Sequence, residues 1–404
     1  MAQKLKSFWL NVGFLDRDMD LSGRKQILTA LADLEVEVRA VFNYMQTASK
    51  PNGINKVWLL KMVGRGPLAS LWLFCRQQWI LFKNMDADVV VLRAFNLHFS
   101  LPVWFLRRKL QRRDYPKFIL DIRTLPVDMP DNWRGRQREL RFRSSIWIAA
   151  RYMDGFMMIT ETMKNRVLAP WERPPKPACV WTTGVDPELF NPSGVTGPPD
   201  GLTFDDRFVI MYHGIFSPNR GLQQTLEAIR LLRDRHPELL FFLLGKGPAE
   251  QHLGDLVKKL KIENHVIIHP PVALESVPAY INTTNVGILP FPDLDWWDTS
   301  SPIKLFEYLS MAKPVIVTDI AAHRSVLGDL PCGLFASGND PRQLAGAIAS
   351  AVAAKDHLPQ WGQQGRELVL KEFTWNRQAM KIKHFFEHLL TPPAASHTTI
   401  TKII

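Results

Sequence analysis

The sequence predicts an α/β protein built from two Rossmann-like domains that face each other across a cleft. Three observations carry this prediction: the length of 404 residues, short apolar runs that alternate with helical patterns in both halves, and one Pro- and Gly-rich stretch between the halves. A chain of this length exceeds what one hydrophobic core usually holds. Ligands of open parallel sheets bind beyond the carboxyl ends of the strands, so the cleft is the expected site.

The first half begins with MAQKLKSFWLNVG, whose short apolar run indicates a first strand and not a cleaved signal peptide. Later apolar runs are bounded by charged or turn residues, as is typical of parallel strands that are covered on both faces. We expect these strands at 36–42, 88–93, 117–122, 156–160 and 178–183, with helices at about 23–34, 68–83, 98–112 and 136–152.

A Pro- and Gly-rich stretch, NPSGVTGPPDG at 191–201, is the expected linker. The domains are therefore predicted at 1–190 and 202–375, followed by a C-terminal helix and tail at 376–404 that pack back on the first domain. The second domain should contain strands at 207–213, 239–244, 265–269, 285–290 and 314–318, and helices at about 221–235, 249–261, 275–282, 303–312, 341–355, 361–371 and 377–390.

The net charge of +11 lies in the first half, because residues 1–200 hold 30 Lys and Arg against 19 Asp and Glu. The basic runs RRKLQRR (107–113) and RGRQRELRFR (134–143) indicate an anionic partner, such as a membrane surface or a lipid-linked phosphate acceptor. A solvated helix face is the alternative. Neither run belongs to a recognisable nucleic-acid module, so no nucleic-acid partner is expected.

No apolar stretch reaches the roughly 18–20 residues that span a bilayer. Cys75, Cys179 and Cys332 are odd in number and lack metal-ligand spacing, which favours a reducing cytoplasm and no metal site. The aromatic and basic segment 66–82 fits either a surface-lying amphipathic helix or an ordinary core helix. We therefore expect a cytoplasmic protein with peripheral contact at the inner face of the plasma membrane.

Two glycine-containing strand ends could hold a diphosphate. In YHGIFSPNRGLQQTLEAI (212–229), Gly214 allows a tight turn, and Arg220 stands at a helix entrance where backbone N–H groups favour phosphate. In LLGKGP (243–248), Gly245 permits close backbone approach, whereas Lys246 is expected to be exposed. Plain strand–turn–helix architecture is the alternative for both stretches.

The third stretch, DTSSPIKLFEYLSMAKPVIVTD (298–319), is the most informative. Ser301 and Pro302 indicate a helix start. Lys304 falls in the first turn, where a cation opposes the helix dipole, and an anion bound at the same end would explain it. Glu307 lies on the same face and suits a vicinal diol, as in ribose recognition. A Lys–Glu surface pair is the alternative.

Together these three stretches resemble the retaining glycosyltransferases of family 4, which belong to glycosyl transferases group 1 and have the GT-B fold. The resemblance extends over nearly the whole chain. In that family a Gly-Arg-x-x-x-x-Lys-Gly stretch binds the donor diphosphate. The corresponding GIFSPNRG has Arg220 in place of the lysine and Ile215 in place of the arginine. The family pattern S-x-P-x-K-L-F-E-Y implies that Glu307 binds the donor ribose.

The resemblance implies a set of donor residues. Thr299 stands at the position of a second acidic residue of the family, with Asp298 adjacent, and HPPV (269–272) matches a loop beside the base. The implied catalytic residues are Arg220, Lys304 and Glu307, and the donor-binding set is Gly214, Arg220, Gly245, Val272, Thr299, Ser301, Pro302, Ile303, Lys304 and Glu307.

The resemblance is weaker in the first half, where it implies acceptor-side residues. DLSGRKQ (20–26) matches an acceptor loop and contributes Gly23 and Arg24, and FILDIRTLPVD (118–128) contributes Asp121 and Arg123. His98 follows a strand and is a further candidate, with a structural role as the alternative.

The function implied by the resemblance is that of a hexosyltransferase-type enzyme. It would move a sugar from a UDP- or GDP-sugar to a hydroxyl of a lipid-linked or polysaccharide acceptor, with retention, in cell-envelope or exopolysaccharide biosynthesis. No cofactor is expected besides the nucleotide-sugar substrate. Ile215 and Thr299 depart from the family pattern and leave open a catalytically silent GT-B subunit that binds a partner or lipid. A nucleotide-sugar epimerase is a second alternative.

Overall fold

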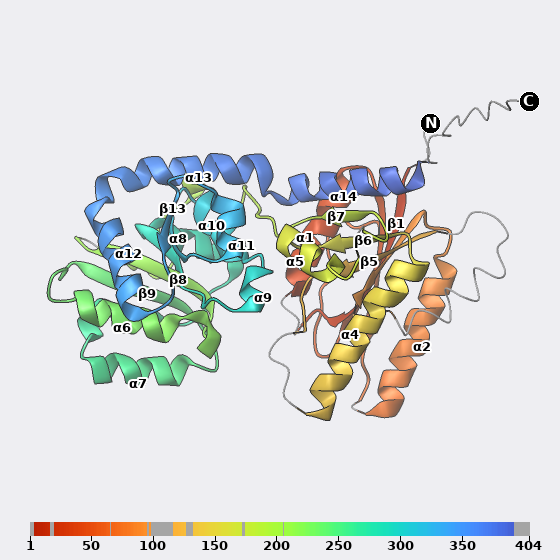
Figure 1. Ribbon diagram of the computed structural model, residues 1–404, viewed down its shortest axis with the longest axis horizontal. Coiled ribbons are helices and arrows are strands. Elements are labelled where there is room, and N and C mark those ends of the chain that lie inside the picture. Colours follow the sequence, from red (N-terminus) through yellow and green to blue (C-terminus); the bar gives the residue numbers. More distant parts are fainter. Residues whose placement is uncertain are drawn as a thin grey trace, which may run out of the picture.

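The computed structural model describes residues 4–16, 20–64, 66–94, 97, 116–126, 132–171, 174–204 and 206–391. It contains two parallel sheets, each flanked by helices, in two lobes (Figure 1). The α/β class and the two Rossmann-like sheets are therefore as predicted. The expected helix at 98–112, with His98, lies outside the described residues.

The first sheet has the strand order β3-β2-β1-β4-β5-β6-β7 and all of its pairs are parallel. Its strands are β1 (Lys6–Phe14), β2 (Glu37–Tyr44), β3 (Lys56–Lys61), β4 (Val89–Arg93), β5 (Lys117–Ile122), β6 (Gly155–Met158) and β7 (Ala178–Val180). The sequence did not predict β3, which is a partly exposed edge strand. The strand expected at 178–183 ends at Val180.

Helices cover both faces of the first sheet. One face packs on α2 (Pro67–Lys83) and α4 (Trp133–Tyr152) through a core cluster that includes Leu73 and Phe142. The other face packs on α1 (Asp20–Asp33) through a second cluster. The short helix α5 (Glu161–Leu168), which was not predicted, begins at the N-cap Thr160, whose hydroxyl accepts from Met163 N.

The second sheet has the order β10-β9-β8-β11-β12-β13 and is also parallel. Its apolar strands are almost fully buried, which explains why they read as continuous hydrophobic runs. The strands are β8 (Phe208–Ile215), β9 (Leu239–Lys246), β10 (Val266–His269), β11 (Val286–Leu289), β12 (Val315–Thr318) and β13 (Gly333–Ala336), of which β13 was not predicted. The helices are α6 (Leu222–Leu232), α7 (Glu250–Leu260), α8 (Val277–Asn282), α9 (Asp295–Asp298), α10 (Ile303–Ser310), α11 (Ala321–Leu327), α12 (Pro341–Ala353), α13 (Leu358–Glu372) and α14 (Trp375–Leu390).

The last two helices run along one side of the molecule, with α13 on the second lobe and α14 on the first (Figure 1). On α14, Phe386 lies 6.2 Å from Trp9, measured between ring centroids, and Lys383 Nζ donates to Leu34 O at 3.0 Å. The helix therefore completes the core on the α1 face of the first sheet.

Polar contacts also join the lobes near the carboxyl ends of their strands. Thr160 Oγ1 donates to Thr299 O at 3.1 Å, and Arg166 forms an ion pair with Asp295 at 2.6 Å. These contacts place α9 and the segment before α10 against α5.

Candidate functional site

Arg220 lies at the entrance to α6, in the single 3₁₀ turn Pro218–Arg220 that follows β8. Its guanidinium carbon is 4.4 Å from the ring centroid of Trp297 and 5.4 Å from that of Phe291. Trp297 Nε1 donates to Asn219 O at 3.1 Å, which fixes the indole against this turn. Burial lowers the pKa of Arg220, and its buried Nε has no hydrogen-bond partner among the described residues. Aromatic faces therefore hold the guanidinium, and no carboxylate of the described part of the chain pairs with it.

Lys304 lies in the first turn of α10, and its side chain crosses the end of β8 at Gly214. Its Nζ is 5.3 Å from the ring centroid of Tyr212. A Cβ placed on Gly214 would be 2.9 Å from Nζ, and Gly214 also has a φ of 108°. Glycine is therefore required here, both for the backbone conformation and for the path of the lysine.

The ammonium group of Lys304 is destabilised in the free protein. Burial and the nearby Arg220 lower its pKa to about 8, although Glu307 acts in the opposite direction. Within the described part of the chain, neither Lys304 nor Arg220 forms an ion pair with a carboxylate. Two adjacent cations that lack a protein anion form a site that an external anion would stabilise.

Glu307 is on the same helix as Lys304 but is only 4% exposed, which excludes a Lys–Glu surface pair. Its Oε2 lies 3.3 Å from Nε2 of His213. Burial raises the pKa of Glu307 to about 7, while Lys304 opposes the shift. Burial and Lys304 also lower the pKa of His213 well below its ordinary value, so the imidazole is neutral. The neutral imidazole of His213 and the carboxyl group of Glu307 are therefore in contact next to Lys304.

The glycines of the second stretch have an architectural role. A Cβ on Gly245 would lie 2.0 Å from Gly214 O, and one on Gly247 would lie 2.2 Å from Phe216 O. Close packing of β9 against β8 therefore accounts for Gly245, and close packing of the segments that follow the two strands accounts for Gly247. Lys246 is exposed, as predicted.

The segment before α10 is fixed by contacts with the first lobe. Ser301 Oγ is 2.6 Å from Thr182 Oγ1 and accepts from Thr183 N at 3.2 Å. Thr183 Oγ1 donates to Ser301 O at 2.9 Å. Pro302 is the N-cap residue of α10. The hydroxyl of Ser301, a predicted donor-binding residue, is therefore engaged in a contact between lobes.

The remaining predicted donor residues lie around the same helix start and the neighbouring loop. Thr299 is 1% exposed, and its hydroxyl donates to Trp296 O at 3.2 Å. The neighbouring Asp298 accepts from Ala321 N at 3.0 Å, at the start of α11. Ile303 packs on the α1-side core of the first lobe, and Val272 packs on the core of the second.

The predicted acceptor-side residues of α1 and β5 form one cluster. Arg24 and Asp121 make a buried ion pair at 2% and 0% side-chain exposure. Trp181 Nε1 donates to Asp121 at 3.3 Å. Arg123 lies 3.6 Å from the ring centroid of Trp181 and donates to its carbonyl at 2.9 Å. The pair is therefore an internal feature of the first lobe.

Gly23 faces the C-terminal helix, because a Cβ there would lie 3.2 Å from the indole of Trp375. The sequence had not singled out the two tryptophans, Trp181 and Trp375, that organise this region. Only their size could have indicated a core role, because polar residues stand beside both of them in the sequence.

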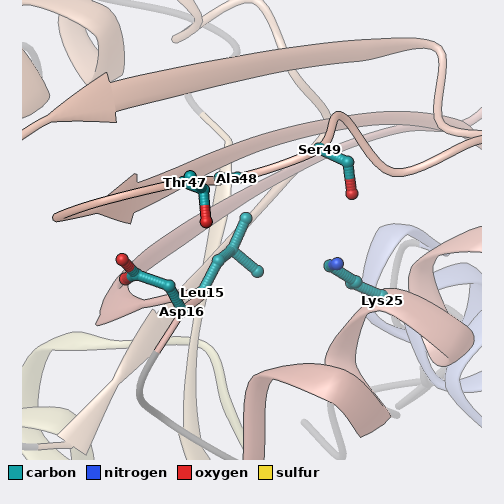
Figure 2. Close-up of a pocket in the computed structure, with 6 residues that line it drawn as sticks. All are labelled: Leu15, Asp16, Lys25, Thr47, Ala48 and Ser49. Atoms are coloured by element: carbon teal, nitrogen blue, oxygen red, sulfur yellow. The ribbon is translucent and has the colours of Figure 1, made fainter. Parts of the chain in front are cut away.

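A polar pocket of about 480 Å³ lies beyond the carboxyl ends of β1 and β2. Figure 2 shows Asp16 and Lys25 on opposite sides of it, with Leu15 between them. The Asp16 carboxylate accepts the backbone N–H groups of Met45 at 3.1 Å and Gln46 at 2.6 Å. These bonds lower the pKa of Asp16, with the Gln46 bond the largest cause. The remaining lining residues are Thr47, Ala48 and Ser49.

Among the residues that the structure describes, no group of three or more His, Cys, Asp or Glu residues is arranged to hold a metal ion. None of the described helices combines the length and apolarity needed to cross a membrane.

The fold corresponds to that of known glycosyltransferases. Residues 198–368 match the family model of glycosyl transferases group 1. The chain is similar to sucrose-phosphate synthase from Thermosynechococcus elongatus, with a TM-score of 0.72 and 16% identity over 96% of this chain and 99% of that one. It is also similar to HepE of Anabaena in complex with UDP and glucose, with a TM-score of 0.71 and 14% identity over 95% of this chain and 99% of that one.

A curated relative is the GDP-mannose-dependent alpha-(1-6)-phosphatidylinositol monomannoside mannosyltransferase of Mycobacterium tuberculosis. It is 24% identical over 50% of this chain and 54% of its own length. Several other curated relatives are matched over less than half of their length. The fold is therefore the GT-B fold, and the matched region, 198–368, is the part of the chain that resembles group 1.

Proposed function

We propose that the protein is a retaining glycosyltransferase of family 4 that transfers a sugar from a UDP- or GDP-sugar to an acceptor hydroxyl. One observation carries the proposal: Arg220 and Lys304 are two adjacent, partly buried cations without a carboxylate partner among the described residues, beside the buried Glu307. A diphosphate would neutralise both cations and raise the lowered pKa of Lys304.

In this proposal the donor diphosphate lies between Arg220 and Lys304, at the N-terminal end of α10. The helix dipole and the two cations stabilise the charge that develops on the leaving nucleotide diphosphate. Trp297 already holds the guanidinium of Arg220, and the side chain of Lys304 is already positioned beside Gly214. The two cations therefore need to move little during the reaction. The Glu307 carboxyl accepts hydrogen bonds from the donor ribose.

The neighbours support a nucleotide-sugar donor without identifying its base. HepE of Anabaena was solved with UDP and with UDP-glucose, and the mycobacterial relative is GDP-mannose-dependent. For this chain the donor is therefore proposed only as a UDP- or GDP-sugar. No cofactor or metal ion is part of the proposal.

The acceptor is proposed as a hydroxyl of a lipid-linked or polysaccharide substrate in cell-envelope or exopolysaccharide synthesis, delivered at the inner face of the plasma membrane. The mycobacterial relative's name specifies a lipid acceptor, and the excess positive charge of this chain lies in residues 1–200. The pocket between Asp16 and Lys25 offers a carboxylate and an ammonium group to acceptor hydroxyls or phosphate (Figure 2).

The donor assignment is tested by measuring nucleotide release from a panel of UDP- and GDP-sugars with the wild type and Glu307→Ala. Release by the wild type from one class of donor, and loss of release in the variant, would support it. If the wild type binds no nucleotide, the donor site is wrong. If Glu307→Ala binds and turns over normally, the ribose assignment is wrong.

A catalytically silent GT-B subunit is the second candidate, favoured by two observations. Ile215 replaces the arginine of the family pattern, and the Thr299 hydroxyl is occupied by Trp296 O. Purified protein that binds a nucleotide sugar but releases no nucleotide with any acceptor preparation would support this candidate over the enzyme.

A further inference from the structure

The helix α2 is apolar on two opposite sides. Its buried residues include Leu73, Gln77 and Ile80, which face the first sheet. At 100° per residue, the opposite side of the helix carries a second apolar stripe. A helix that packs on the core with one side and faces water with the other is ordinarily polar on that second side. This stripe consists of Leu68, Leu71, Trp72 and Trp79, which are 82%, 56%, 47% and 58% exposed, together with the exposed Cys75.

The helix α4 repeats this arrangement on the same face of the sheet. Its buried side, with Phe142, Ile146 and Ala149, joins the same core cluster as α2. The opposite side exposes Leu140 and Trp147, at 66% and 59%. Both helices lie on the same face of the first lobe (Figure 1). Their second apolar stripes lie opposite the buried sides and are exposed. Exposed apolar residues in two neighbouring stripes indicate an interaction surface rather than isolated surface residues.

Cations border both stripes. The sequence of α2 contains Arg76 and Lys83 and no acidic residue. Arg76 lies 5.5 Å from the ring centroid of Trp72, and Lys83 lies 4.9 Å from that of Trp79. The sequence of α4 contains six arginines and a single acidic residue, Glu139. Tryptophan with flanking arginine and lysine is the composition of helices that lie in the interface of an anionic bilayer.

We infer that the α2–α4 face, defined by these exposed residues of α2 and α4, binds the surface of an anionic lipid bilayer. Its leucines and tryptophans enter the boundary between headgroups and acyl chains, and its arginines and lysines contact lipid phosphates. A second copy of the chain fits this face poorly, because the α2 and α4 sequences carry seven net positive charges that self-association would bring together.

The topology connects this face to the acceptor side of the molecule. In parallel sheets each helix starts where the preceding strand ends, so α2 and α4 both begin at the carboxyl edge of the first sheet. The pocket between Asp16 and Lys25 lies at that same edge. Binding through the α2–α4 face would therefore hold the carboxyl edge near the membrane, where a lipid-linked acceptor resides. The binding itself does not depend on the proposed donor site.

The experiment is co-sedimentation of the full chain with vesicles of phosphatidylcholine, with and without phosphatidylglycerol. The test variant is Leu68→Ser with Leu140→Ser. The matched control is Leu231→Ser with Leu370→Ser, because these leucines are 47% and 37% exposed on helices of the second lobe. We expect the wild type and the control to bind phosphatidylglycerol vesicles, and the test variant to bind about tenfold more weakly. High salt should weaken the binding.

A second measurement addresses the wild type directly and does not depend on how a variant folds. Brominated lipids should quench wild-type tryptophan fluorescence in phosphatidylglycerol vesicles, and less so in Trp79→Phe with Trp147→Phe. Failure of the wild type to bind either vesicle, or equal binding by the test and control variants, would overturn the inference. A wild-type dimer that Leu68→Ser with Leu140→Ser converts to a monomer would also overturn it and identify a second copy as the partner. Nucleotide binding, measured in parallel, reports on the donor site separately.

Discussion

The Nζ atom of Lys304 lies 2.9 Å from the point that a Cβ of Gly214 would occupy, so the glycine determines where the lysine can lie. This relationship joins the first predicted diphosphate stretch to the third, through two residues that are 90 positions apart in the sequence. It places the ammonium group at the end of β8, on the same Tyr212 ring that lies near Arg220.

Gly214→Ala should therefore damage both stability and nucleotide binding. Alanine at a φ of 108° is strained, and its methyl group would displace Lys304. We expect a loss of about 1–3 kcal/mol in the free energy of unfolding and about tenfold weaker UDP or GDP binding. Urea unfolding and calorimetry measure the two effects. Gly194→Ala, where a Cβ would meet nothing within 4 Å, is the control. Unchanged nucleotide affinity in Gly214→Ala would contradict the role of this glycine.

Arg220→Leu should weaken nucleotide binding without lowering the stability of the free protein. The guanidinium is desolvated and has no ion-pair partner among the described residues, so its removal should leave the free protein at least as stable as the wild type. Nucleotide affinity should fall about 10- to 100-fold, because a charge-assisted contact to phosphate is lost. Thermal unfolding with and without UDP or GDP measures both effects. The exposed Arg230 of the same helix provides the control, Arg230→Leu, which should bind normally.

Nucleotide affinity should fall as the pH rises through about 8. In the free protein the pKa of Lys304 is lowered to about 8, chiefly by burial. Because a bound diphosphate favours the charged lysine, binding takes up a proton above that pH, and affinity should decline by up to about tenfold per pH unit. Isothermal titration at several pH values measures the decline. Lys304→Gln should bind weakly and lack this pH dependence, and a wild-type affinity that is constant from pH 7 to 9 would be inconsistent with the site.

Ionisation of the buried Glu307 carboxyl should lower the free energy of unfolding of the free protein as the pH rises. Its pKa in the folded protein is raised from 4.5 to about 7, chiefly by burial. A raised pKa contributes stability that is fully present below about 4.5 and is lost as the pH rises through about 7. Glu307→Gln should therefore match the wild type near pH 4.5 and unfold a few degrees higher at pH 8. The same melting-temperature difference at both pH values would show that the carboxyl is not held in its neutral form.

The buried ion pair of Arg24 and Asp121 should contribute to the stability of the first lobe. Asp121→Ala leaves Arg24 buried without its partner, and we expect a loss of about 3–5 kcal/mol in the free energy of unfolding. Arg24→Met combined with Asp121→Leu should recover most of that loss, and urea unfolding of the three proteins tests this. An unfolding midpoint unaltered by Asp121→Ala would mean that the pair is not buried as described.

The sequence predicted the two parallel sheets because their strands are continuous apolar runs between charged or turn residues. It missed β3, whose partial exposure weakens the hydrophobic signal, and β13, which is short and contains Gly333. The positions of Lys304 and Glu307 on one helix follow from their spacing. Their burial, and the 3.3 Å approach of Glu307 to His213, could not be predicted, because both depend on how β8 and α10 pack.

The sequence also could not show which glycines are architectural. Gly214 and Gly245 look alike in the sequence, since each follows an apolar strand. Only the packing of β9 on β8 shows that Gly245 accommodates Gly214 O, whereas Gly214 accommodates the side chain of Lys304. Likewise, the contact of Ser301 with Thr182 and Thr183 joins parts of the chain that no local pattern connects.

The central claim is that Arg220 and Lys304 together form the diphosphate site. Titration calorimetry of UDP and GDP with the wild type and with Arg220→Leu combined with Lys304→Gln tests it most directly. We predict that the wild type binds at least one of the two nucleotides and that the double variant, still folded by its thermal unfolding, binds neither. Wild-type affinity in the double variant, or binding of neither nucleotide by the wild type, would contradict the claim.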